Sequence, residues 1–222
     1  MSVFFKMLEK YWQVFLSGMF GTLWLAFVTV VFGTLLGTGI ALIKMSKKKL
    51  PNFIVTVYVE LIRGTPILLQ LYFFWIGLPK LTRPLGWEPS NTVCILIALL
   101  VNSSAYVAEI IRAGVQAVDK GQTEAARSLG ISESNIMKKI IMPQAVKNIL
   151  PALCNEFIMM VKETSLASVF FVNELMTAQK TVQSVTYRAL ESLTVVGIIY
   201  FVITFGLSKV VKILERRLAV SD

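Results

Sequence analysis

Long apolar runs, separated by shorter polar stretches, dominate the sequence from end to end. A helix needs about 20 mostly apolar residues to cross the hydrocarbon core of a membrane, and five runs reach that length. They cover about residues 18–43, 51–78, 91–111, 150–172 and 193–214. We therefore expect an all-α integral membrane protein with five transmembrane helices, because a helix satisfies its own backbone hydrogen bonds in lipid.

The residues before the first run have a different pattern. Phe5, Leu8 and Trp12 alternate with Lys6 and Lys10, which predicts a short amphipathic helix on the outer membrane surface. We expect the chain to divide into an N-terminal amphipathic segment (1–17), a transmembrane domain (18–215) and a cytoplasmic tail (216–222).

Composition and charge agree with a membrane protein and add its orientation. Charged residues make up only 16% of the chain, against about 25% in soluble domains. The net charge of +9 would suit nucleic-acid binding, but the positions of the charges argue against it. Fourteen Lys and Arg residues follow the first, third and fifth runs, against six on the other side. This asymmetry predicts a cytoplasmic C-terminus and an outside N-terminus.

The chain offers little for covalent or metal chemistry. It contains no His, and Cys94 and Cys154 lie in or beside apolar runs without metal-ligand spacing. We expect no metal site and no catalytic residues, which disfavours an integral-membrane enzyme.

The longest polar stretch, about residues 112–149, lies between the third and fourth runs. Thr123 is placed to cap one short helix, and Gly130 suits the position just after it. Ser132 is placed to cap a second helix, and Pro143 marks its expected end. The loop is therefore predicted to form two cytoplasmic helices with a sharp break between them.

Residues in this loop follow the pattern E-A-A-x3-G-x9-I-x2-P, from Glu124 to Pro143. The pattern resembles the EAA loop of the membrane subunits of bacterial ABC importers, which docks on a separate ATPase. An ordinary surface helix would be the alternative if the tripeptide stood alone. The resemblance implies ATPase contacts, or coupling residues, at Glu124, Ala125, Ala126, Arg127, Leu129 and Gly130.

Further stretches extend the resemblance to about residues 18–215. The sequences RGTP (63–66), NSSAYVAEIIRAG (102–114), LPAL-x-NE (150–156) and KETSL (162–166) are similar to motifs of polar amino-acid ABC permeases of the histidine, arginine and glutamine type. Ser104 and Ala113 depart only at small positions. Glu163 stands where Asp or Asn is often found, which could alter the depth or preference of a pocket.

The resemblance implies the type I ABC importer permease fold in a bacterial plasma (inner) membrane. It also implies a second permease subunit, expected to be identical but open to a heterodimer, a pair of cytoplasmic ATPases and an extracytoplasmic binding protein. The chain lacks the sequence G-x4-G-K-[ST], so it has no P-loop of its own. We expect no cofactor in this chain, with ATP and Mg bound by the partner ATPase.

Charged residues inside the apolar runs are costly and are therefore expected to be paired or functional. Arg63 and Glu163 each lie twelve residues past a proline near the cytoplasmic boundary, or about 18 Å into the membrane. Glu60 lies three residues before Arg63 and can pair with it. We expect Arg63 to stabilise a helix break at residues 64–66, and Glu109 to form a structural pair or gate with Arg112.

An amino-acid substrate needs an anion for its ammonium group and donors for its carboxylate. The candidate substrate-binding residues are Glu163, Glu156, Asn155, Thr164, Ser165, Arg63 and Glu60. An acidic face suits a basic amino acid, but polar neutral ones, including glutamine and cystine, stay open. Alternatives are structural ion pairs that only hold helices together, or a permease for another small polar solute. A channel would not need the docking loop.

Overall fold

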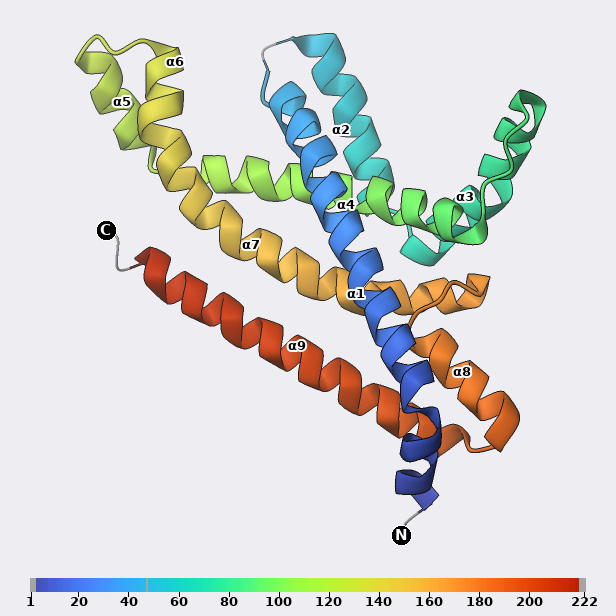
Figure 1. Ribbon diagram of the computed structural model, residues 1–222. Coiled ribbons are helices and arrows are strands. Elements are labelled where there is room, and N and C mark those ends of the chain that lie inside the picture. Colours follow the sequence, from blue (N-terminus) through green and yellow to red (C-terminus); the bar gives the residue numbers. More distant parts are fainter. Residues whose placement is uncertain (1–2, 47, 220–222) are drawn as a thin grey trace.

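The computed structural model describes residues 3–46 and 48–219, and the described chain is built from helices joined by short connections (Figure 1). The α-helices are α1 (Val3–Lys44), α2 (Lys49–Arg63), α3 (Ile67–Thr82), α4 (Asn91–Gln116), α5 (Lys120–Ser128), α6 (Glu133–Asn135), α7 (Met142–Glu163), α8 (Leu175–Thr186) and α9 (Ala189–Ala219). Two 3-10 helices, η1 (Arg83–Leu85) and η3 (Thr164–Phe170), and one π-helix, η2 (Ile136–Ile141), lie between them.

Three of the described helices are long and apolar enough to cross a membrane: α1, α4 and α9. The helices α2 and α3 together are also long and apolar enough, but they are bent by 107° at the break between them. They add a fourth span only if the two are taken as one broken span. The helix α7 carries four charged side chains and does not meet the same test. The all-α membrane fold is confirmed, whereas the number of five spans stays a prediction.

The expected break at residues 64–66 is confirmed, so residues 51–78 do not form one continuous helix, and their crossing of the membrane as one span stays a prediction. Pro66 lacks a backbone N–H and disfavours helical geometry at Thr65, so α2 ends at Arg63. The chain turns there, and α3 leaves in a new direction.

Close packing of α1 on α4 forms the centre of the fold (Figure 1). A Cβ atom added at Gly33 would lie 2.8 Å from the Ser103 Oγ, and one at Gly37 would lie 2.8 Å from the Ser104 carbonyl oxygen. Both distances are shorter than van der Waals contact. The two glycines, one helical turn apart on α1, therefore allow the helix backbones to approach closely.

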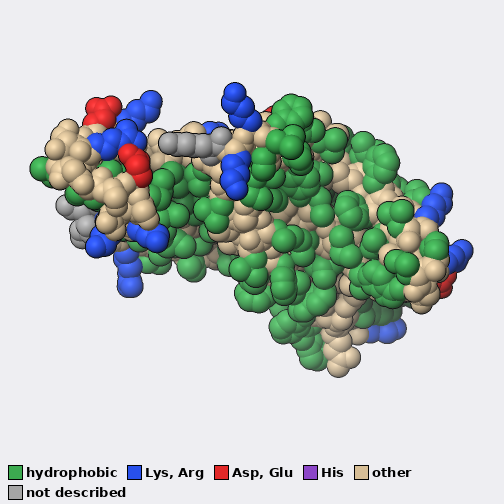
Figure 2. All heavy atoms as spheres, turned by 90° about the horizontal axis from the view of Figure 1, so that it is seen from above, with side chains coloured by type: hydrophobic (Ala, Val, Ile, Leu, Met, Phe, Trp, Pro, Cys, Tyr) green, Lys and Arg blue, Asp and Glu red, His purple; other side chains and the backbone are tan. Residues whose placement is uncertain are grey.

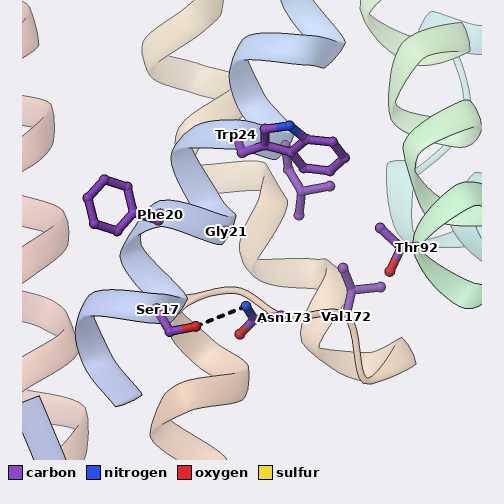
Figure 3. A pocket seen from close by; sticks show the side chains of 8 residues that line it. Ser17, Phe20, Gly21, Trp24, Thr92, Val172 and Asn173 are labelled. Atoms are coloured by element: carbon purple, nitrogen blue, oxygen red, sulfur yellow. Dashed lines mark hydrogen bonds between the residues drawn. The ribbon is translucent and has the colours of Figure 1, made fainter. Parts of the chain in front are cut away.

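The N-terminal half of α1 packs on the loop before α8 in the same way. A Cβ atom at Gly21 would lie 2.2 Å from the Asn173 carbonyl oxygen. The Asn173 side-chain amide also donates a hydrogen bond to Ser17 Oγ at 3.2 Å (Figure 3). Trp24 and Phe20 border a cavity of about 610 Å³ there, and they point to different sides of α1 (Figure 3). This loop therefore packs directly against α1.

The two ends of the transmembrane domain are not marked by breaks. The helix α1 runs without interruption from Val3 to Lys44, so no separate amphipathic helix ends at residue 17. The helix α9 continues to Ala219, beyond the expected start of the tail at residue 216. The last expected tail residues, 220–222, lie outside the described residues.

Pro143 does not end a helix, contrary to the expectation for the polar loop. The π-helix η2 precedes it, with the Met142 N–H bonded to the Met137 carbonyl, and the chain continues directly into α7. Pro143 sits in the first turn of α7, where a missing N–H costs nothing. The wider turn of the π-helix accommodates the proline, so η2 and α7 form one continuous helical segment.

Candidate functional site

The break between α2 and α3 is held by a buried glutamine. The Gln70 Nε2 donates to the carbonyl of Ile62 at 2.7 Å, to the carbonyl of Thr65 at 3.1 Å and to the Thr65 hydroxyl at 2.9 Å. Its side-chain carbonyl accepts a hydrogen bond from Asn102 of α4 at 2.9 Å. Gln70 thus satisfies carbonyls that the break leaves without helical partners and ties them to α4. Sequence reasoning assigned no role to Gln70, although a glutamine in an apolar run was a usable signal.

Arg63, the last residue of α2, does not pair with Glu60. Its guanidinium lies 4.0 Å from the Glu109 carboxylate of α4 and 5.7 Å from the centre of the Tyr106 ring. Glu60 is exposed on α2. The predicted Glu60–Arg63 pair is therefore wrong, because the end of α2 directs Arg63 toward α4 instead of along its own helix.

Glu109 is shared by cations from three helices. Lys44, at the end of α1, donates to its carboxylate at 2.9 Å, and the Arg112 Nε donates at 2.8 Å. Arg112 also bonds Gln116, one turn further along α4. The predicted pairing of Glu109 with Arg112 is confirmed, whereas Lys44 was missed because it comes from another helix. The cluster joins the ends of α1 and α2 to the part of α4 that leads into the polar loop of residues 112–149.

The two acidic residues of α7 lie on one face, as their spacing predicts. Glu156 is half-buried and accepts a hydrogen bond from the Ser103 hydroxyl of α4 at 3.3 Å. Ser103 is the residue that packs on Gly33 of α1. Glu163 is half-buried at the last residue of α7, where the α-helix changes to the 3-10 helix η3. Glu156 therefore lies where α7 packs against α4, and Glu163 lies at the turn where α7 ends.

The other predicted substrate residues are not all available to a ligand. Asn155 is exposed and Ser165 is half-buried, but Thr164 is fully buried and its hydroxyl donates to the Val161 carbonyl at 2.8 Å. Within the described residues, no hydrogen bond or ion pair joins Arg63 or Glu60 to the predicted residues of α7. The single chain thus presents two separate polar groups, one at the α2–α3 break and one on α7.

The first helix of the polar loop of residues 112–149 is α5, which starts earlier than the sequence predicts. Asp119, not Thr123, caps it, by accepting a hydrogen bond from the Gly121 N–H at 2.7 Å. Gly130 has φ +75°, so the predicted left-handed residue after the helix is confirmed. Arg127 is paired with Glu133 of α6 at 2.5 Å, and this carboxylate raises the pKa of the guanidinium above its ordinary value. The pair closes the sharp turn between α5 and α6.

The predicted coupling residues divide into an exposed and a buried set. Ala126 is only 3% exposed and packs against Ile136 and Ile141, so it cannot contact a partner. Ala125 is exposed, and Leu129 is 80% exposed, which is unusual for leucine. Charged side chains gather at the end formed by α5 and α6, whereas hydrophobic side chains cover much of the adjoining face (Figure 2).

Comparison with known proteins agrees with these features. Residues 29–220 match the family described as binding-protein-dependent transport system inner membrane component. The chain is 39% identical to the arginine transport system permease protein ArtQ of Bacillus subtilis, over 93% of both chains. It is 36% identical to the L-cystine transport system permease protein TcyB of the same organism, over 95% of this chain and 88% of that one.

Solved structures show the same fold. A crystal structure of an amino acid ABC transporter with histidines superposes with a TM-score of 0.91 at 47% identity, covering 98% of this chain and 100% of that one. The MetNI methionine ABC transporter in an inward-facing form superposes with a TM-score of 0.71 at 18% identity, covering 93% of this chain and 98% of that one. The chain therefore belongs to the family of inner membrane components of binding-protein-dependent transport systems, and it is a multi-pass transport subunit rather than an enzyme.

Proposed function

We propose that this chain is the permease subunit of an ATP-driven ABC importer for polar L-amino acids, with basic amino acids as its preferred cargo. The observation that carries the preference is the acidic face of α7, where Glu156 and Glu163 lie at membrane depth without a bonded cation among the described residues. Relatives named for arginine and cystine transport, and a related transporter solved with histidines, support an amino-acid cargo.

The two polar groups suit the two ends of an amino acid. Glu163, at the end of α7, offers an anion to an ammonium or guanidinium group. The α2–α3 break offers Arg63 as a donor to a carboxylate, since its contact with Glu109 at 4.0 Å is longer than a hydrogen bond. Asn155 and Ser165 complete the α7 group as uncharged donors. The substrate crosses unchanged, so no covalent step is needed.

A second permease subunit supplies the missing wall of this pathway. Glu60, Arg63 and Asn155 are exposed in the single chain although they lie in or beside membrane helices. Such exposure to lipid costs about 2.5–3.5 kcal/mol for each charge on insertion scales. A second copy, facing the first across a water-filled path, removes that cost. We expect two identical copies, with the N-terminus outside and the C-terminus in the cytoplasm.

Energy for transport enters through the cytoplasmic loop. The helix α5 presents Ala125 and Leu129 to a cleft of the partner ATPase, while Glu124 and Arg127 form the charged rim. The partner binds ATP and Mg, and this chain carries no cofactor. Movement of α5 reaches the membrane along two routes. One is α4, which carries Glu109 and Arg112 two turns and one turn before its end at Gln116, and the other is η2, which continues into α7.

The docking face is tested by copurification with the ATPase. Ala125→Trp and Leu129→Ser should each reduce the amount of ATPase retained, because the first fills the contact and the second removes its exposed apolar side chain. Thr181→Trp is the control, since this exposed residue of α8 lies on the opposite side of the membrane from α5 in the proposed topology. Full retention in both loop variants would remove α5 from the docking face.

The cargo is tested by uptake into vesicles that contain the complete transporter, binding protein and ATP. Glu163→Gln should lower arginine uptake about tenfold or more, since a charge-assisted contact is worth about 1.5–3 kcal/mol. Glutamine uptake should fall less. Glu88→Gln, an exposed residue near η1, is the matched control. Unchanged arginine kinetics with the ATPase still bound would remove Glu163 from the pathway.

A further inference from the structure

The helix α8 ends at Tyr187 in a conformation that aromatic residues rarely adopt. Tyr187 has φ 57° and ψ 22°, which is left-handed, and its backbone N–H donates to the Gln183 carbonyl at 2.8 Å. Helices that end in this way usually carry glycine at this position, because a Cβ atom is strained there. The Tyr187 side chain is nevertheless 91% exposed. Packing inside the subunit therefore does not explain why this strained position holds an aromatic residue.

Tyr187 borders a pocket on the exposed face of α8, with a cavity volume of about 350 Å³. The pocket is lined by four polar or aromatic residues at helical spacing: Lys180, Gln183, Ser184 and Tyr187. Residues three and four apart lie side by side on a helix, so these four share one face. This face belongs neither to the polar groups of the proposed substrate pathway nor to the docking face of α5.

The pocket offers hydrogen-bond donors and a positive charge. The Lys180 Nζ donates to the Ser168 carbonyl at 3.1 Å and to the Ser168 hydroxyl at 3.2 Å. It has no carboxylate partner within the part of the chain that the structure describes. The Gln183 side-chain carbonyl accepts a hydrogen bond from Gln179 at 2.7 Å, which leaves the amide N–H groups of Gln183 as donors. The chemistry that complements this pocket is a carboxylate.

The exposed face of α8 lies in water rather than in lipid. The opposite face of the helix, with Leu175, Ala178 and Val182, is buried in a cluster with residues of α1 and α9. The apolar side of α8 is thus already covered by its own subunit. The exposed side carries polar residues, which are costly in a lipid environment: Lys180, Thr181, Gln183 and Ser184. A lipid is therefore a poor occupant for this pocket.

The position of α8 selects among the partners of the transporter. The candidate span α9 starts at Ala189, two residues after Tyr187, and ends near Arg216 and Arg217. In the proposed topology that basic end is cytoplasmic, so α8 lies on the outer side, away from the ATPase. It also lies away from α2, at the end of the subunit that holds the start of α1 (Figure 1). The second copy is proposed to face α2, which leaves the binding protein on which this family depends.

We propose that the pocket on α8 is a docking site for the extracytoplasmic binding protein. The Tyr187 ring inserts into the surface of that protein, and an acidic side chain of that protein pairs with Lys180. Exposed tyrosines are among the residues that contribute most to the binding free energy of protein interfaces. The inference rests on the proposed topology and on the binding-protein partner, and it does not depend on which amino acid is carried.

Binding to the purified permease–ATPase complex in lipid nanodiscs tests the site, with the transporter's own binding protein, loaded with arginine, as the probe. Tyr187→Gly should weaken binding about tenfold or more, because it removes a central aromatic contact. Its unfolding temperature should not fall, since glycine adopts the left-handed conformation without strain. Phe171→Gly is the matched control and should bind normally, because Phe171 is 84% exposed with φ 58° but lies outside the pocket.

The charge has its own variants in the same assay. Lys180→Gln should weaken binding about tenfold and make it less sensitive to salt, because it removes the charge contact that salt screens. Lys180→Arg should keep most of the binding. Lys80→Gln, an equal loss of charge at an exposed residue on the outer side in the proposed topology, should bind like the unaltered transporter.

The outcomes separate this site from the proposed function. Equal binding by Tyr187→Gly and the unaltered transporter would overturn the site and leave the partner in place. An equal loss in Tyr187→Gly and Phe171→Gly would overturn the pocket as the contact. Loss of permease dimers in Tyr187→Gly would assign the pocket to a second copy instead. No binding to the unaltered transporter would overturn the binding-protein partner, and the site with it.

Discussion

The strongest prediction concerns the carboxylate that three helices share. In Glu109→Gln, Lys44 and Arg112 lose the anion that now accepts their hydrogen bonds. The side chains of Lys44 and Glu109 are only 12% and 17% exposed, and that of Arg112 is 29% exposed. The substitution therefore leaves two cations partly desolvated next to Arg63, which adds a third positive charge at 4.0 Å from the same site.

The size of the effect follows from burial. Removing one partner of a buried ion pair costs about 3–5 kcal/mol. The cluster keeps some contact with solvent and glutamine keeps one acceptor, so we expect about 2–3 kcal/mol of lost stability. For a chain of this length, that loss lowers the unfolding temperature by about 5–10 °C. In a double-mutant cycle with Lys44→Gln, the coupling should be about 1 kcal/mol or more.

Thermal unfolding of the purified permease in detergent, followed by intrinsic fluorescence, measures this loss. Glu88→Gln is the control, because its ion pair with Arg83 is exposed, at 67% and 77% for the two side chains. An exposed pair contributes about 1 kcal/mol or less, so the control should shift by only a few degrees. A shift for Glu109→Gln no larger than that of Glu88→Gln would refute the reasoning that this cluster holds the ends of α1 and α2 against α4.

Three further predictions use the same purified protein. Gly37→Ala should destabilise it by about 1–3 kcal/mol through overpacking. Gly39→Ala is the control, because an added Cβ there has nothing within 4 Å, and equal unfolding temperatures for the two variants would disprove the tight α1–α4 contact. Gln70→Leu should lower the free energy of unfolding, measured by chemical denaturation, by about 1–3 kcal/mol, because it leaves the Asn102 amide and the Ile62 carbonyl unpaired. No change would show that the break between α2 and α3 does not depend on Gln70. Burial raises the pKa of the Glu174 carboxyl above its ordinary value of 4.5, so the folded state holds the proton more tightly and the free energy of unfolding declines as pH rises above 4.5. Glu174→Gln should flatten that decline in a series of unfolding measurements across pH, and the same pH dependence in both proteins would contradict the prediction.

Features governed by neighbouring residues could be predicted from the sequence alone. Gly64, Thr65 and Pro66 break a helix wherever they occur, because the proline restricts the residue before it and removes a donor. Gly130 adopts a left-handed backbone, with φ +75°, because glycine has no Cβ to clash in that conformation. The membrane class follows from run lengths and lysine positions, which depend on the chain and the bilayer rather than on packing.

Features governed by contacts between distant segments could not be predicted. Arg63 has Glu60 within one turn, yet its guanidinium lies beside Glu109 of another helix. Ala126 belongs to a motif suited to docking, yet it packs against η2 inside its own subunit. Leu129, three residues later, is the apolar side chain left exposed. Spacing along a helix defines a face but not what that face meets.

The sequence by itself determined the membrane class, the family and the breaks at residues 64–66 and at Gly130, because each rests on local geometry or on transfer between water and lipid. The tertiary structure decided which charges pair and which coupling residues are exposed. Those outcomes depend on the angle at which α2 meets α4 and on how α5 packs against η2. Such angles come from the sum of many side-chain contacts, and no single stretch of sequence carries them.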